Sequence, residues 1–190
     1  MKIGVLALQG SVIEHIDTLK KLKVNAVEVR LPEELDDLDG LIIPGGESTT
    51  IGDLMNQYGL DKGIVEKYNK GMSIYGTCAG AILLAKYVDF VQPKLGLMDI
   101  SITRNGYGRQ IDSFEADLNI EKIGKFRGVF IRAPIVDCVH DGVKILAQFN
   151  NMPVMAEQGH LLITTFHPEL TDDTRVHKYF IDMVKFNRML

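Results

Sequence analysis

The stretch Gly71–Ala85, GMSIYGTCAGAILLA, decides the fold, because an apolar run passes through a cysteine into a segment of helical composition. GMSIYG is apolar enough for a central parallel strand, and the small and apolar residues of AGAILLAKY predict a packed helix. Cys78 lies between them in GTCAG, which matches the turn that lifts a nucleophile clear of a sheet in a strained backbone conformation. The amides at the start of the helix would favour a thiolate and stabilise an oxyanion. The alternative is a small cysteine that fills core volume.

Strands and helices alternate before this stretch, which is typical of an α/β protein. KIGVLAL, VNAVEVR and LDGLIIPGG are predicted strands. Ser11–Leu22 is a predicted helix, in which Ser11 and Glu14 are placed as a capping box. The fold class predicted here is therefore α/β with a mostly parallel central sheet.

The pattern changes after the cysteine. From Gly96 to Gln158, short strands follow one another without helices, which indicates an antiparallel extension of the sheet. HLLITTFHPEL then restores a buried strand, and Asp173–Leu190 is a final amphipathic helix. No repeat or linker interrupts the chain, so we expect one domain over residues 1–190.

Composition excludes several classes of protein. The chain has 190 residues, 46% hydrophobic and 24% charged, which suits one globular domain rather than a disordered chain. Two cysteines without a C-x-x-C pair give neither a disulfide framework nor a zinc finger, and no metal is expected. The apolar run at the N-terminus is too short for a signal-peptide core, so we expect no signal peptide, and no run approaches the roughly 18 apolar residues of a membrane span. Without a disulfide framework, a signal peptide or a membrane span, we expect a cytoplasmic protein with no membrane partner. A net charge of −4 gives no reason to expect a nucleic-acid partner.

A base for the cysteine is predicted at another strand end. His167 follows LLITTF in HPE, so it would emerge at the same edge of a parallel sheet as Cys78. Glu169 would fix the tautomer of His167 and stabilise its imidazolium, which makes a Cys-His-Glu triad. A histidine in a surface turn is the alternative for His167.

The other histidines are weaker candidates. His177 is predicted to be solvated on the final helix, and His140 to be a turn residue. His15 could border the site, but we expect a structural or partner-facing role for it.

A second glycine turn, PGGES at Pro44–Ser48, ends another predicted strand. Its backbone amides could face the thiol and donate to an oxyanion. A simple turn in which Glu47 or Ser48 caps the next helix explains the segment equally well.

Together these motifs resemble a known family. GTCAG, GGES and HPE resemble the class I glutamine amidotransferases of the flavodoxin-like triad type. LALQG with His15, PGGESTTI, GTCAGAILLA, RNGYGRQIDSFE, IRAP and FHPELTDDTRVHKYF resemble, more narrowly, the glutaminase subunits of pyridoxal 5'-phosphate synthase, over nearly the whole chain. The resemblance implies a flavodoxin-like three-layer sandwich.

The resemblance also implies roles for individual residues. Cys78 would attack the carboxamide of L-glutamine, with His167 as the base and Glu169 orienting it. The remaining residues are implied as the glutamine site (Gly46, Glu47, Ser48, Arg104, Ile131 and Arg132), the oxyanion hole (Gly45, Gly46 and Ala79) and an element that responds to the partner (Gln9 and Gly10). An arginine suits the α-carboxylate of a free amino acid, although Arg104 alone could be a surface arginine.

The family passes its ammonia to a separate synthase subunit, a (β/α)8 barrel, in a complex with twelve copies of each subunit. The resemblance thus implies a glutaminase for vitamin B6 biosynthesis that needs no cofactor of its own. Two alternatives stay open: a glutaminase subunit of another ammonia-using synthase, and a non-catalytic regulatory subunit.

Overall fold

Parallel strands form the centre of the fold, as the apolar runs predict. The computed structural model describes residues 1–104 and 113–189. The parallel strands are, in spatial order, β12 (Leu161–Thr164), β4 (Ser73–Thr77), β3 (Gly40–Ile43), β1 (Lys2–Leu6) and β2 (Asn25–Val29). On the β12 side, β11 (Met152–Gln158) and β10 (Lys144–Phe149) add antiparallel pairs, which completes a seven-stranded sheet. The mostly parallel sheet and its antiparallel extension are both confirmed.

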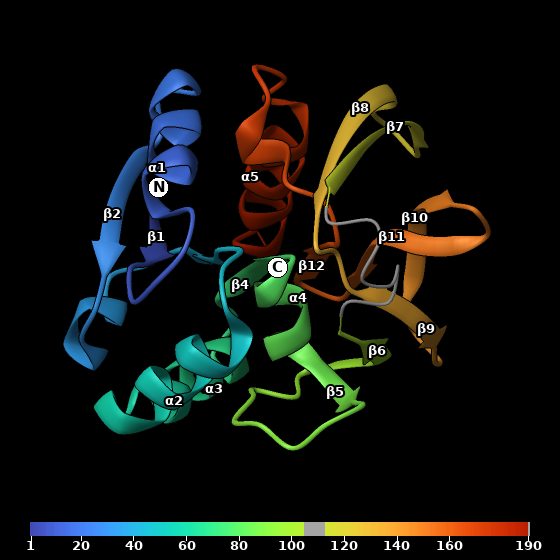
Figure 1. The fold of residues 1–190 in the computed structure, drawn as a ribbon. Coiled ribbons are helices and arrows are strands. Elements are labelled where there is room, and N and C mark those ends of the chain that lie inside the picture. The colour runs from blue at the N-terminus through green and yellow to red at the C-terminus, as the bar shows by residue number, and fades with distance from the viewer. Residues whose placement is uncertain (105–112, 190) are drawn as a thin grey trace.

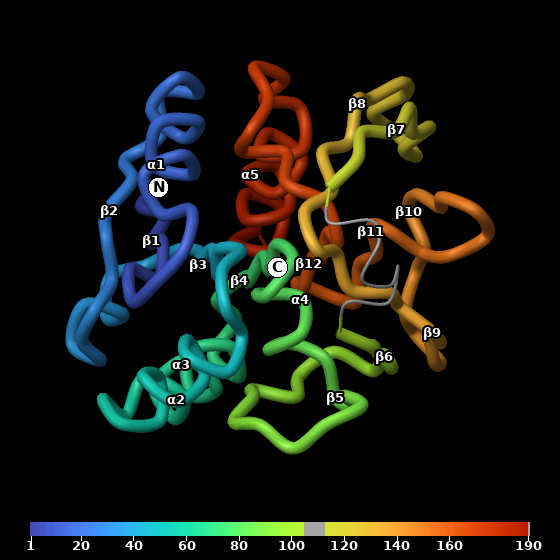
Figure 2. Tube along the Cα trace, in the orientation of Figure 1, coloured from blue at the N-terminus to red at the C-terminus, as the bar shows by residue number. Residues whose placement is uncertain are grey.

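Helices cover both faces of this sheet and make three layers (Figures 1 and 2). One face carries α1 (Val12–Lys21) and α5 (Arg175–Asn187), and the other carries α2 (Ser48–Tyr58), α3 (Leu60–Asn69) and α4 (Ala79–Leu84). Two apolar clusters fill the spaces between the layers. One contains Ile51 and Met55 of α2, and the other contains Leu19 of α1 and Phe180 of α5.

Beyond β4, the sequence prediction needs a correction. The predicted helix AGAILLAKY ends at Leu84, and Ala85–Val88 forms strand β5 instead. β5 pairs with β6 (Met98–Thr103), which pairs with β9 (Ile135–Val139) in a separate three-stranded sheet. The helix was expected to continue because the local composition suits a helix, but pairing with the distant β6 decides the conformation.

A two-stranded hairpin stands next to the sheet. It consists of β7 (Ser113–Ile120) and β8 (Gly124–Ile131), and Figure 1 shows it projecting beside α5. Short 3-10 turns complete the described elements: η1 (Pro32–Leu35) and η2 (Pro168–Leu170). No helix in residues 1–104 and 113–189 is long and apolar enough to cross a membrane.

The parallel arrangement brings four strand ends together. β1, β3, β4 and β12 all finish at one edge of the sheet, where a ligand site is expected in an open α/β fold. The residues that follow these strands include Gln9, Gly45, Cys78 and His167. Segments far apart in the sequence therefore meet at one place.

Candidate active site

Cys78 occupies a strained turn between β4 and α4. Its backbone angles are φ 49° and ψ −101°, in a region that residues with a side chain rarely adopt. The backbone N–H of Cys78 donates to the carbonyl of Thr164 at 2.8 Å, which ties the turn to β12. The thiol is 3.9 Å from the carbonyl oxygen of Ile131, and only 7% of the residue is exposed. The predicted nucleophile turn is therefore present.

The glycines of GTCAG permit the close packing of this turn. A Cβ atom at Gly80 would lie 2.1 Å from the carbonyl oxygen of Ile43, and one at Gly76 would lie 2.5 Å from the backbone of Gly80. Neither position accommodates a side chain, so α4 rests directly on β3 and β4. This packing fixes Cys78 at the edge of the sheet.

His167 and Glu169 lie beside the cysteine. The backbone N–H of His167 donates to Val129 at 2.8 Å, and its Nδ1 donates to Oε1 of Glu169 at 2.7 Å. The Gly45 turn touches both reactive side chains, because a Cβ atom at Gly45 would be 2.4 Å from Cε1 of His167 and 3.4 Å from Cβ of Cys78. The three residues of the predicted triad are thus brought together.

Hydrogen bonds with its two neighbours favour the protonated form of His167. Burial lowers the pKa of His167, but hydrogen bonds with Cys78 and Glu169 outweigh burial and raise the pKa to about 10. Burial likewise opposes ionisation of Glu169, yet the facing His15 and the hydrogen bonds from His167 and Ser11 lower the pKa of Glu169 to about 2. At neutral pH an imidazolium therefore lies between the sulfur and an ionised carboxylate.

A cavity of about 630 Å³ opens in front of the sulfur. It is lined by the predicted site residues Gln9, Gly10, Gly45, Gly46, Glu47, Ser48, Cys78, Ala79, Arg104, Ile131, Arg132 and His167, and also by Ser11, Ile82, Ser113 and Leu170. Glu169 is buried behind His167 and does not line the cavity. Of the sequence motifs, residues 105–112 of RNGYGRQIDSFE lie outside the described residues.

Arg104 and Glu47 form an ion pair at the wall of the cavity. Nη1 of Arg104 is 3.2 Å from Oε1 of Glu47 and 2.9 Å from Oγ1 of Thr49. Oε2 of Glu47 accepts from the backbone N–H of Thr50 at 2.8 Å, so Glu47 also caps α2. The guanidinium stacks over the ring of Phe90, 4.3 Å from its centroid. The sequence analysis did not single out Thr49 or Phe90.

Gln9 and Gly10 pack on the second glycine turn. The side-chain oxygen of Gln9 accepts from the backbone N–H of Glu47 at 2.8 Å. Ser11 N–H donates to the carbonyl of Gly45 at 3.0 Å, which fixes the orientation of that peptide. The end of β1 therefore controls the geometry of the Gly45–Gly46 peptide.

The predicted capping box is absent. The side chain of Ser11 makes no hydrogen bond to the start of α1, although Ser11 is its N-cap. Its hydroxyl instead donates to Oε1 of Glu169 at 2.7 Å, a charge-assisted hydrogen bond to a buried carboxylate that is stronger than the neutral bond by which a capping oxygen accepts from a backbone N–H. Ser11 is thus hydrogen-bonded to the candidate triad.

The prediction of a solvated His177 is wrong. His177 is fully buried, and its Nε2 lies 2.8 Å from Nδ1 of His15, which is also fully buried. His177, Phe180, Ile181 and Val184 follow helical spacing along the buried face of α5, so periodicity could have revealed it. His15 lies behind the triad, with its Nε2 3.6 Å from Oε1 of Glu169, and His140 is exposed.

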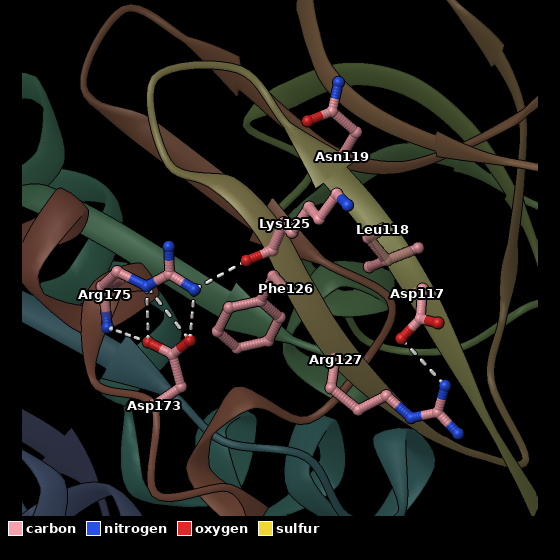
Figure 3. A pocket seen from close by; sticks show the side chains of 8 residues that line it. All are labelled: Asp117, Leu118, Asn119, Lys125, Phe126, Arg127, Asp173 and Arg175. Atoms are coloured by element: carbon pink, nitrogen blue, oxygen red, sulfur yellow. Dashed lines mark hydrogen bonds and ion pairs between the residues drawn. The ribbon is translucent and has the colours of Figure 1, made fainter.

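A second groove, which shares no lining residue with the cavity beside Cys78, lies beside the β7–β8 hairpin (Figure 3). Its arginines are already paired. Arg175 donates to the carbonyls of Ile123 and Lys125 and to the Asp173 carboxylate, and Arg127 is paired with Asp117. The contacts of Arg175 therefore attach the hairpin to the start of α5. Within residues 1–104 and 113–189, no group of three or more His, Cys, Asp or Glu side chains is placed to hold a metal ion.

Comparisons with known proteins agree with this geometry. The model of the SNO glutamine amidotransferase family matches residues 5–186. The pyridoxal 5'-phosphate synthase subunit PdxT of Desulforamulus reducens is 53% identical over 188 residues, which cover 97% of this chain and 100% of the relative. The same subunit of Thermotoga maritima is 50% identical, with the same coverage. A solved structure described as a glutamine amidotransferase is 47% identical and superimposes with a TM-score of 0.94, covering 96% of this chain and 98% of that one.

Proposed function

The chain belongs to the SNO glutamine amidotransferase family, and we propose that it is the glutaminase subunit of a pyridoxal 5'-phosphate synthase. One observation carries the chemistry: the His167 ring contacts Cys78 on one side and Glu169 on the other, at the wall of a cavity that also contains Arg104. This arrangement suits a covalent acyl transfer in which one imidazole serves both halves of the reaction.

In the first half, the sulfur of Cys78 attacks the side-chain carboxamide carbon of L-glutamine. The carbon–sulfur bond forms, and the carbon–nitrogen bond then breaks as His167 delivers its proton to the leaving ammonia. A γ-glutamyl thioester results. The proton is available because the pKa of His167 is raised to about 10.

The oxyanion of this step needs backbone donors. The amide of Ala79 and the Gly45–Gly46 peptide flank the sulfur, and both line the cavity. Ser11 holds the carbonyl of Gly45 at 3.0 Å, so a change at the end of β1 would reorient this peptide. We assign these groups to the oxyanion hole.

In the second half, His167 accepts a proton from water, which attacks the thioester carbon and releases glutamate. Glu169 keeps the same imidazole oriented and charge-compensated through its 2.7 Å hydrogen bond to Nδ1. Water supplies the oxygen, and the sulfur leaves with the electron pair. The enzyme returns to its starting state.

Arg104 is the proposed ligand of the glutamine α-carboxylate, because a guanidinium grips a carboxylate with two parallel hydrogen bonds. Its pairing with Glu47 positions it in the absence of substrate. Gly46, Glu47, Ser48, Ile131 and Arg132 line the same cavity and complete the proposed glutamine site.

The proposed partner is the synthase barrel that consumes the ammonia. Gln9 and Gly10 are placed to transmit docking of the barrel to the glycine turn, since they contact the Glu47 amide and the Gly45 carbonyl. The family resemblance further supports a cytoplasmic complex with twelve copies of each subunit.

The chain offers its own control for the proposed nucleophile. Cys78 is buried in the cavity, whereas Cys138 is exposed on β9. In the presence of the synthase subunit, the glutamine mimic 6-diazo-5-oxo-L-norleucine is expected to label Cys78 alone and to abolish ammonia release. The Cys138→Ala variant should label and hydrolyse glutamine like the wild type, and Cys78→Ala should do neither while remaining folded. Absence of label at Cys78 in an assembled complex would instead indicate a non-catalytic subunit.

A further inference from the structure

A buried polar network extends behind the triad, and the mechanism above leaves it unused. Nε2 of His15 lies 3.2 Å from Oγ1 of Thr77 and 3.6 Å from Oε1 of Glu169. Nδ1 of His15 lies 2.8 Å from Nε2 of His177. His15, Thr77 and His177 come from α1, β4 and α5, and all three are fully buried. The network thus joins the residue before the nucleophile to the triad carboxylate.

Burial favours the neutral form of both histidines of this pair. Burial is the main cause that lowers the pKa of His15, and burial lowers the pKa of His177 to about 3. Tyr75 packs edge-on against both rings, and it also contacts Phe180. A neutral imidazole has one N–H and one bare nitrogen, so the positions of two protons define the state of the pair.

One arrangement of these protons satisfies the surroundings. If His15 carries its proton on Nε2, the N–H points toward the Thr77 hydroxyl and the ionised Glu169, and Nδ1 accepts from Nε2–H of His177. Nδ1 of His177 is then a bare nitrogen, which agrees with its having no hydrogen-bond partner among the described residues. The reverse arrangement would aim a lone pair of His15 at the carboxylate and leave a buried N–H of His177 unpaired, and both are unfavourable.

We propose that His177 and His15 are positioning residues of the triad. His177 sets the tautomer of His15, and the Nε2–H of His15 fixes the position of the Glu169 carboxylate relative to Thr77 at the end of β4. The proposal deepens the glutaminase function and rests on it. Neither histidine lines the cavity, so the pair acts on the triad and not on glutamine directly.

Activity measurements with the assembled complex test this role. His177→Leu leaves Nδ1 of His15 without a donor, so we expect kcat to fall about 10- to 100-fold, as for other small misplacements of catalytic groups, with KM unchanged. His177→Gln restores a donor at the Nε2 position, and we expect it to recover most of the lost kcat. His160→Leu is the matched control. The Nε2 of His160 also makes a partly buried contact, with the carbonyl of Tyr68 at 3.1 Å, but His160 precedes β12 and so lies at the end of that strand away from the triad. Equal kcat values for His177→Leu and the His160 control, or no recovery in His177→Gln, would overturn the proposal.

A second measurement does not depend on activity. Long-range ¹H–¹⁵N spectra of the wild-type chain at neutral pH report which imidazole nitrogen carries the proton, with assignments from His177→Gln and from the conservative variant His15→Gln. We expect Nε2–H tautomers for both His15 and His177. An Nδ1–H tautomer of His15 would refute the positioning role even in an active glutaminase, whereas the expected tautomers in a chain without glutaminase activity would count against the proposed function alone.

Discussion

The side-chain oxygen of Gln9 accepts a hydrogen bond from the backbone N–H of Glu47 at 2.8 Å, which joins the end of β1 to the glycine turn beside the nucleophile. The contact is close, since a Cβ atom at Gly46 would lie 2.3 Å from the same oxygen. Any partner that moves the end of β1 therefore moves the turn that faces the sulfur.

The Gln9→Ala variant tests this connection. It removes the acceptor of the Glu47 amide, which is exposed enough to bind water instead, so the free energy of unfolding should change by no more than about 1 kcal/mol. We expect the synthase-stimulated glutaminase rate to fall strongly. Gln148→Ala, at an exposed position of β10, is the control and should keep the full rate. Full stimulation of Gln9→Ala would remove Gln9 from the activation mechanism.

A methyl group at Gly10 is expected to displace the same turn. In Gly10→Ala the new Cβ would lie 1.8 Å from the carbonyl oxygen of Gly45, at a φ of +107°. We expect about 2–3 kcal/mol less stability in urea unfolding and a large loss of kcat. Gly59→Ala is matched, because Gly59 also has a positive φ, +72°, but no atom lies within 4 Å of the added methyl. Gly59→Ala should lower the free energy of unfolding by about 1 kcal/mol and leave kcat unchanged. Equal kcat values for Gly10→Ala and Gly59→Ala would contradict this prediction.

Arg104→Lys tests recognition of the substrate carboxylate. A lysine retains the charge but cannot make two parallel hydrogen bonds, so KM for glutamine should rise about 10-fold or more, with a smaller effect on kcat. Arg127→Lys changes an arginine that pairs with Glu115 and Asp117 on the hairpin, and steady-state kinetics should show no change in KM. An unchanged KM in Arg104→Lys would place the carboxylate elsewhere in the cavity.

The buried titrating groups predict how stability depends on pH. The pKa of His177 falls from 6.5 to about 3 on folding, so below pH 6.5 the unfolded chain binds a proton that the folded chain does not. Stability should therefore fall on acidification, by up to about 1.4 kcal/mol per pH unit from this group. Glu169, whose pKa falls from 4.5 to about 2, adds to this loss only below pH 4.5. The pKa of His167 rises from 6.5 to about 10, so its contribution is complete below pH 6.5 and is lost as the pH rises toward 10.

Urea unfolding between pH 6.5 and 4.5 isolates the contribution of the buried histidines. The slope of the unfolding free energy against pH should be smaller in His177→Gln than in the wild type. His140→Gln removes an exposed histidine and keeps both buried ones, so its slope should match the wild type. A wild-type slope in His177→Gln would show that His177 does not resist protonation in the folded chain.

The strands and the triad were predictable because their signals are local. The apolar runs of β1, β3, β4 and β12 identify buried parallel strands. Cys78 directly follows β4, and His167 comes shortly after the end of β12 at Thr164. Parallel strands share one edge for their carboxyl ends, so the meeting of these residues needs no further information. Glu169 is two residues from His167, which keeps the pair within one turn.

Other features depend on residues far apart in the sequence. Ser11 bonds Glu169 across 158 positions, and His15 bonds His177 across 162, so neither partner is visible in a local window. The conversion of Ala85–Val88 from a predicted helix to β5 likewise follows from pairing with β6. β7 was also not predicted, although its burial alternates as in a half-buried strand. At Ala85–Val88, tertiary contacts therefore override the local preference.

The central claim is that this chain hydrolyses glutamine when it is docked to its synthase. The most direct test is ammonia release from L-glutamine by the purified chain, alone and with the purified pyridoxal 5'-phosphate synthase barrel subunit. The account predicts strong stimulation by the barrel, which Cys78→Ala abolishes without unfolding. A folded wild-type chain that binds the barrel and releases no ammonia would contradict the account.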